Sequence, residues 1–164
     1  MVEQPHIRIE RQRHAAQIID RLRACIAAVL APYPVDMAYL YGSVARGRPL
    51  PSSDIDIALV LTEILTHYRR LVLELEIQAA LEDACGLSNV DVRAISHAPL
   101  TVQGRVIQEG LLLYERDKAR RVTFEALTRR RYFDYQPTAD RMRRAFLDHV
   151  RRKGLTGGRS RHRT

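Results

Sequence analysis

Paired carboxylates behind a glycine-serine turn are the residues of this sequence best suited to chemistry. Gly42-Ser43 stands ten residues ahead of Asp54, and Asp56 follows at i+2 inside an apolar run. Because alternate residues of a strand face the same side, Asp54 and Asp56 are expected to project together while the residues between and after them face a buried layer. Two neighbouring carboxylates repel each other unless a cation lies between them. The spacing therefore predicts a metal site.

Magnesium is the metal that fits this pattern, since it takes one or two protein carboxylates and completes its shell with water and phosphate oxygens. A Gly42-Ser43 turn after a strand offers backbone N–H groups and a hydroxyl to a phosphate. Arg46 and Arg48 lie in the same loop and can neutralise further phosphate charge, although solvated loop arginines are the alternative. Ser43 can also cap a helix, which is compatible with a phosphate contact. The stretch predicts a nucleoside triphosphate site.

A third carboxylate, Asp91, lies on a later predicted strand, in the segment NVDVRAI. If that strand neighbours the first, Asp91 can bind the metal or accept a proton from an attacking group. Arg93 follows on the same face of the strand. It can pair with Asp91 and compete with the metal, or it can reach a phosphate, and the sequence leaves both open.

Hydrophobic periodicity predicts the elements that position these residues. Gly86 is expected to end one helix and Pro137 to begin another. Strands and helices in mixed order predict an α/β domain. The expected helices are 9–31, 66–85, 99–109, 118–135 and 138–152, and the expected strands are 37–41, 54–61, 89–95 and 111–115.

The division of the chain follows from composition. The core is expected over 1–116, a helical extension of the same domain over 117–152, and a disordered basic tail over 153–164. The 164 residues carry a formal net charge of +8, and six of these charges belong to 151–164, which holds no acid. The basicity is therefore mostly an appendage, and the tail offers salt-sensitive attraction to nucleic acid without sequence preference.

The cysteines and the N-terminal residues indicate the cellular compartment of the protein. Cys25 and Cys85 lie sixty residues apart in helix-like apolar settings, and they are interpreted as core thiols rather than as a disulfide or metal pair. The N-terminus is charged where a signal peptide needs an apolar segment, and the longest apolar run, 24–31, is too short to span a bilayer. These features favour a cytoplasmic, reduced protein without membrane contact.

The motif resembles a known family. Gly42-Ser43, ten residues, Asp54-x-Asp56 and then Asp91 on a later strand look like the DNA polymerase beta type nucleotidyltransferase superfamily. GSVARG followed by SDIDIALV is most similar to its minimal nucleotidyltransferases, the MNT proteins. IQEGLLLYERDKARRVTFEALTRRRYFDY resembles the C-terminal part of MNT antitoxins. The resemblance covers roughly residues 15–150.

The resemblance implies the nucleotidyltransferase fold, a small mixed β-sheet of about four strands with flanking helices and a helical C-terminal extension. It implies that ATP is the substrate, that AMP passes to an acceptor hydroxyl and that pyrophosphate is released. It further implies a partner, a HEPN-domain RNase toxin that is neutralised by AMP on a tyrosine. The implied site comprises Gly42, Ser43, Arg46 and Ser53 for the nucleotide, and Asp54, Asp56 and Asp91 as the catalytic ligands of two Mg²⁺ ions, with Asp91 as the base.

Two other functions remain open at this stage. One is a small-molecule nucleotidyltransferase, such as one acting on aminoglycosides, although only about thirty residues of helix are left to build an acceptor pocket. The other is an antitoxin that acts by binding and occlusion alone. The arginine clusters of the C-terminal helices are usually solvated faces, but with interleaved aromatic residues they also suit a docking surface for an acidic partner or RNA.

Overall fold

The computed structural model describes residues 5–153 as an alternating α/β chain. The predicted tail beyond 153 lies outside the described residues. All four expected strands are present, and their ends lie within two residues of the expected ones. The elements are α1 (Pro5–Leu30), β1 (Val35–Tyr41), α2 (Gly42–Ala45), β2 (Ile55–Leu61), α3 (His67–Cys85), β3 (Val90–Ala94), α4 (Leu100–Glu109), β4 (Leu111–Glu115) and α5 (Lys118–Lys153).

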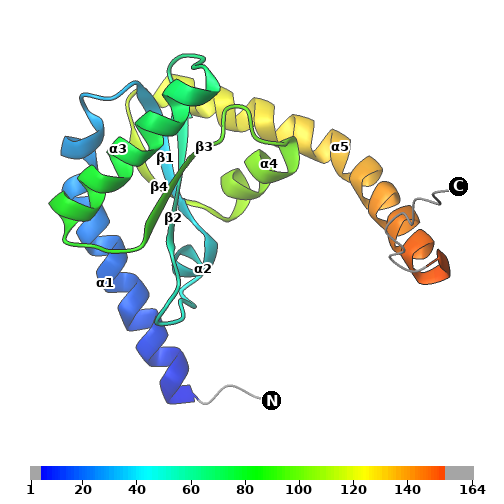
Figure 1. Ribbon diagram of the computed structural model, residues 1–164, viewed down its shortest axis with the longest axis horizontal. Coiled ribbons are helices and arrows are strands. Elements are labelled where there is room, and N and C mark those ends of the chain that lie inside the picture. Colours follow the sequence, from blue (N-terminus) through cyan, green and yellow to red (C-terminus); the bar gives the residue numbers. More distant parts are fainter. Residues whose placement is uncertain (1–4, 154–164) are drawn as a thin grey trace, which may run out of the picture.

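One mixed sheet organises the domain, with strand order β3-β2-β1-β4. β2 and β3 run parallel, whereas β1 is antiparallel to both of its neighbours. α1 and α3 cover one face of the sheet, and α4 with the first half of α5 covers the other (Figure 1). Because both faces are covered, successive residues of β2 are buried in turn on opposite sides, Ile57 in the larger core and Ala58 in the smaller. This confirms the expected fold.

The helix α3 has the local signals that its sequence predicts. The Thr66 hydroxyl accepts a hydrogen bond from the Arg69 amide (3.4 Å), and Gly86 ends the helix in the left-handed conformation with φ 61°. Two glutamates of α3 also accept from the exposed edge of β3. Glu82 Oε1 accepts from Val90 N (3.0 Å), and Glu74 Oε1 accepts from the amide of Ala94 (2.8 Å). The helix therefore satisfies backbone donors that an edge strand would otherwise leave unpaired.

The C-terminal part is one helix, so the expected break at Pro137 is wrong. α5 runs through Pro137 without a change of element. Proline removes one backbone N–H, but this position is exposed, where water can satisfy the freed carbonyl, and no glycine interrupts the helix on either side.

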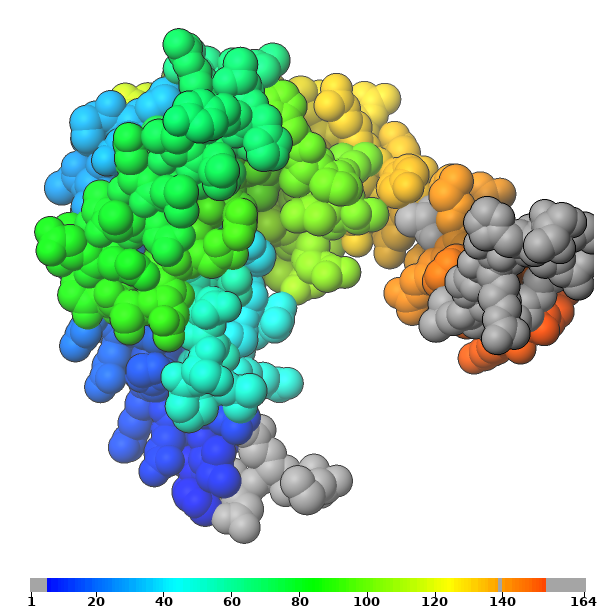
Figure 2. Space-filling view, viewed as in Figure 1, coloured from blue at the N-terminus to red at the C-terminus, as the bar shows by residue number. Residues whose placement is uncertain are grey.

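The two halves of α5 have different surroundings. In the first half Phe124 packs against the smaller core, Thr128 is buried, and the Tyr132 ring lies where a Cβ on Gly104 would be. The second half stands away from the body, and residues 140–149 are all exposed (Figures 1 and 2). From residue 133 onward, the exposed large apolar side chains of α5 are Phe133, Tyr135, Met142, Phe146 and Leu147.

The interpretation of the cysteines as free thiols is also wrong. Cys25 of α1 and Cys85 at the end of α3 form a disulfide, with Cα atoms 5.7 Å apart. The two helices pack side by side, and this brings together residues that sequence spacing alone does not relate. The cytoplasmic prediction therefore loses the support that it took from the cysteines. Among residues 5–153 the structure contains no helix with the length and hydropathy needed to cross a membrane.

Reduction of this disulfide is expected to lower the thermal stability substantially. A crosslink across sixty residues stabilises by roughly 4 kcal/mol through loss of entropy in the unfolded chain, which corresponds to a melting temperature on the order of 10 °C higher. Scanning calorimetry with and without dithiothreitol measures the shift. The Cys25→Ser/Cys85→Ser variant, which should melt at the lower temperature in both buffers, is the control. A wild-type melting temperature that dithiothreitol leaves unchanged would contradict the crosslink.

Candidate active site

The turn at Gly42 lies in close contact with the Asp56 carboxylate. β1 ends at Tyr41, and Gly42 takes φ +75° as it opens the short helix α2, which the buried Val44 anchors. A Cβ on Gly42 would overlap the Asp56 carboxylate, whose Cγ would lie 2.9 Å away. Left-handed backbone and close approach both require glycine here. The predicted turn and the predicted carboxylate therefore belong to one site.

The three aspartates lie near one another. Asp56 on β2 and Asp91 on β3 are register partners in the parallel pair, so their side chains share a face. Asp54 is exposed and precedes β2, because the strand begins one residue later than expected. Burial raises the pKa of Asp56, and the charges of Asp91 and Asp54 raise it further. Negative charge therefore gathers around Asp56, and the charge of Arg46 offsets it in part.

This cluster matches the chemistry of a hard divalent cation, since its donors are carboxylate oxygens that lie close enough to repel one another. In the conformation described for residues 5–153, no three His, Cys, Asp or Glu side chains are placed to hold an ion together. At Asp91 a cationic side chain pairs with the carboxylate. Arg93 Nε donates to Asp91 Oδ1 at 3.0 Å, which raises the pKa of Arg93. Of the two roles left open for Arg93, the structure has the pair with Asp91.

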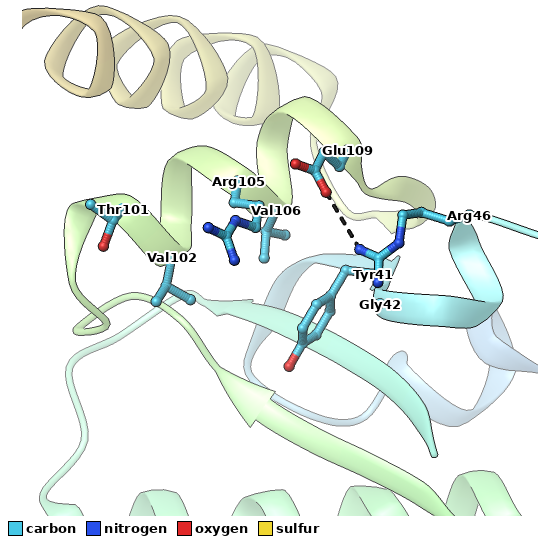
Figure 3. A pocket seen from close by; sticks show the side chains of 8 residues that line it. All are labelled: Tyr41, Gly42, Arg46, Thr101, Val102, Arg105, Val106 and Glu109. Atoms are coloured by element: carbon cyan, nitrogen blue, oxygen red, sulfur yellow. Dashed lines mark hydrogen bonds and ion pairs between the residues drawn. The ribbon is translucent and has the colours of Figure 1, made fainter. Parts of the chain in front are cut away.

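A cavity of about 410 Å³ adjoins the Gly42 turn and is lined by one face of α4 (Figure 3). Arg46, a predicted nucleotide-binding residue, lies on its rim and pairs with Glu109 at 3.5 Å. The sequence reading missed the contribution of α4. Its signal was present in the spacing, because residues four apart share a helix face. The lining residues are Tyr41, Gly42, Arg46, Thr101, Val102, Arg105, Val106 and Glu109.

The two serines have different places. Ser43 lies in α2 directly after Gly42, and its carbonyl accepts from Arg48 N (2.9 Å), which folds the motif loop back. Ser53 closes a turn of that loop, where its hydroxyl accepts from Leu50 N (2.8 Å). Ser53 is not part of the cavity lining. Its nucleotide-binding role stays a prediction.

The two tyrosines of β1 also have different surroundings. Tyr39 is buried and its hydroxyl donates to Glu125 (2.9 Å), so it serves the packing of the sheet. Its pKa is raised by burial first and then by Glu125. Tyr41 is half-buried and lines the cavity. Burial raises the pKa of Tyr41, and Asp56 and Asp91 add to the effect. Tyr41 therefore belongs to the surroundings of the candidate site as well as to the strand.

Comparison with known proteins agrees with this geometry. The family model described as Polymerase beta, Nucleotidyltransferase matches residues 25–119. No curated protein matched the chain. Among solved structures, a chain of a toxin-antitoxin complex with AMP-PNP has a TM-score of 0.54 at 24% identity, covering 83% of this chain and 97% of that chain. A chain of the toxin-antitoxin complex MntA-HepT has a TM-score of 0.52 at 22% identity, covering 75% and 91%.

A nucleotidyltransferase domain is the class that the sheet, the glycine turn and the carboxylates define. The match over more than half of the chain shows that this protein belongs to the polymerase beta nucleotidyltransferase family. The solved structures, at identities under 25%, show the same fold.

Proposed function

We propose that this protein is an antitoxin that transfers AMP from ATP, with Mg²⁺, to a tyrosine hydroxyl of a HEPN RNase toxin and so neutralises it. The observation that carries the proposal is the contact between the Gly42 turn and Asp56, with Asp91 in register beside it. Chains of similar fold are described as parts of toxin-antitoxin complexes, one of them with AMP-PNP. This supports a protein partner and a nucleotide substrate.

The proposed roles of the residues are those that the family resemblance implies, and the order of the residues across the sheet supports them. Gly42 and Ser43 would hold the triphosphate through backbone N–H groups and the hydroxyl, and Arg46 would add charge from the rim of the cavity. Asp54 and Asp56 would hold two Mg²⁺ ions together with Asp91. The bound metal supplies charge neutralisation at the phosphates and lowers the pKa of an attacking hydroxyl.

The transfer itself is a substitution at phosphorus. The acceptor oxygen forms a bond to the α-phosphorus, the bond between that phosphorus and the bridging oxygen of the β-phosphate breaks, and pyrophosphate leaves. Asp91, on the side of β2 opposite to the Gly42 turn, accepts the proton of the acceptor hydroxyl. This requires Arg93 to move off Asp91 first.

The ion pair between Arg93 and Asp91 favours one alternative, an antitoxin that inhibits by binding alone. In that case the carboxylate would stay neutralised and no transfer would occur. Incubation with a HEPN protein encoded next to this chain, ATP and Mg²⁺, followed by the intact mass of both proteins, separates the two functions. One or more AMP masses on the partner support transfer. A tight complex with suppressed RNase activity and no added mass would support binding alone.

The uncovered half of α5 is expected to be a contact for that partner. Met142→Glu/Phe146→Glu should weaken the complex at least about tenfold, since large apolar side chains dominate protein interfaces. Isothermal titration calorimetry measures the dissociation constant, and circular dichroism confirms the helix. Leu75→Glu, at an exposed apolar position of α3, is the matched control. Equal effects of both variants would contradict a contact specific to α5.

A further inference from the structure

A second, smaller cavity of about 230 Å³ lies beside the edge strand β3, against the first turns of α3. Its walls carry two guanidinium groups, two imidazoles and one carboxylate. They come from the beginning of α3 and from the end of β3 with the turn that follows it (Figure 1). The polar residues are His67, Arg70, Glu74, Arg93 and His97.

The single carboxylate of this cavity is already engaged. Glu74 is buried, and its Oε1 accepts from Ala94 N at 2.8 Å, while Arg70 Nε lies 3.9 Å from the same oxygen. Asp91, which pairs with Arg93, is not part of the lining, so the lining itself sets two guanidinium groups and two imidazoles against one carboxylate and is rich in N–H donors. Such a set of donors suits an oxyanion that accepts several hydrogen bonds at once.

One wall of the cavity is held in place. The turn that carries His97 is fixed by Gln103, whose amide nitrogen donates to Ala98 O (2.9 Å) and Ser96 O (3.4 Å). A preformed wall lowers the entropy lost when a ligand binds. By contrast, the Arg93 side chain is 58% exposed and can turn.

Arg93 connects this cavity to the candidate active site. Its Nε donates to Asp91 at 3.0 Å, and the same side chain lines this cavity together with Glu74. Across the sheet the order is the Gly42 turn on β1, Asp56 on β2, Asp91 on β3, and then this cavity beyond the edge of β3. The cavity thus lies on the side of Asp91 that is farther from the Gly42 turn, where the acceptor would approach.

We propose that this cavity is an acceptor-side binding site for a phosphate-type oxyanion, and that an anion held there draws Arg93 away from Asp91. The anion is either free phosphate or a phosphate ester carried by the acceptor molecule. The role of Asp91 in this statement rests on the proposed function, whereas the anion site itself does not. The consequence is that the carboxylate becomes available only when the acceptor side is occupied.

A titration without ATP, metal or partner tests the site. Inorganic phosphate is added to ¹⁵N-labelled protein at constant ionic strength, and the amides of Ala94 and His97 and the Nε–H of Arg93 are followed by NMR. We expect saturable shifts of all three signals. Arg70→Gln/His97→Asn should raise the dissociation constant at least about tenfold, because it removes charge-assisted hydrogen bonds. Arg69→Gln, on the same helix but outside the cavity, is the matched control and should behave as wild type.

Parallel titrations with dimethyl phosphate and acetate identify the ligand. Binding of the diester as well as phosphate points to an ester on the acceptor, and binding of phosphate alone points to the free anion. Equal binding of acetate, shifts centred on the Gly42 turn, shifts unchanged in Arg70→Gln/His97→Asn, or the absence of saturable shifts would each overturn the site. Shifts of Ala94 and His97 with a static Arg93 Nε–H would overturn the coupling to Asp91.

The outcome is separable from that of the proposed function. If phosphate binds and moves Arg93 while no AMP is ever transferred, the anion site stands and the transfer fails. If AMP is transferred but phosphate does not bind here, the transfer stands and this inference fails.

Discussion

Asp54→Asn/Asp56→Asn is expected to abolish AMP transfer, with a loss of about 10³-fold or more. Both substitutions keep the size of the side chain but remove the charge that would hold the metal against the phosphates. Electrostatic stabilisation of this kind is usually the largest single contribution to catalysis. The rate of AMP transfer to the partner, followed by intact mass, measures the loss.

The same double variant should not lose stability. The pKa of Asp56 is raised in the folded protein by burial and by Asp91 and Asp54. A raised carboxyl pKa means that the folded state disfavours the ionised form, so the fold loses stability as the pH rises through that pKa. A neutral amide removes the penalty at neutral pH. We therefore expect an unchanged or higher melting temperature together with lost transfer.

The control is Asp83→Asn, an exposed carboxylate of α3. It should leave both transfer and melting temperature near the wild-type values. Transfer that persists in Asp54→Asn/Asp56→Asn would show that these carboxylates do not serve the reaction. Loss of transfer with a large fall in the melting temperature would instead identify a structural role.

Gly42→Ala is expected to reduce transfer by about two orders of magnitude or more and also to destabilise the fold. The new methyl group would overlap the Asp56 carboxylate, and the residue would have to keep φ +75°. Either the carboxylate or the turn must move, and both belong to the site.

Gly86→Ala separates the effect of backbone strain from the effect of overlap with the Asp56 carboxylate. Gly86 also has a left-handed backbone, φ +61°, but nothing lies within 4 Å of the position that its Cβ would take. Its substitution should cost roughly 1 kcal/mol from backbone strain and leave transfer unchanged. Melting temperatures and transfer rates of the two variants are compared directly. Equal transfer in both would contradict the contact between the Gly42 turn and Asp56.

Much of this architecture was predictable from sequence, because local signals and the site motif agree. The helix-ending Gly86 and the apolar strand around Asp56 follow from residue type and spacing. Whether the strand of Asp91 neighbours that of Asp56 stayed open in the sequence, and the structure pairs the two strands in parallel. The missed features depend on contacts between distant segments. The disulfide requires that two helices lie side by side, and the cavity beside Gly42 requires that α4 lies over the end of β1.

The predicted helix boundary at Pro137 was wrong for a different reason. A proline is usually a helix boundary, but its cost is small where the freed carbonyl is exposed to water, and exposure is a property of the fold rather than of the local sequence. The position of Arg93 was predictable, but its partner was not. Strand alternation placed it beside Asp91, but whether it contacts a carboxylate or a phosphate depends on how the side chain lies in the folded protein.

The two glutamates of α3 that accept from the β3 amides set a limit on assembly. An open strand edge invites a strand of another chain to extend the sheet by main-chain pairing. At β3 the donors of Val90 and Ala94 are already taken by Glu82 and Glu74. Strand addition along this edge is therefore disfavoured, and a protein that approaches Asp91 from here must be recognised by its side chains, through charge and shape.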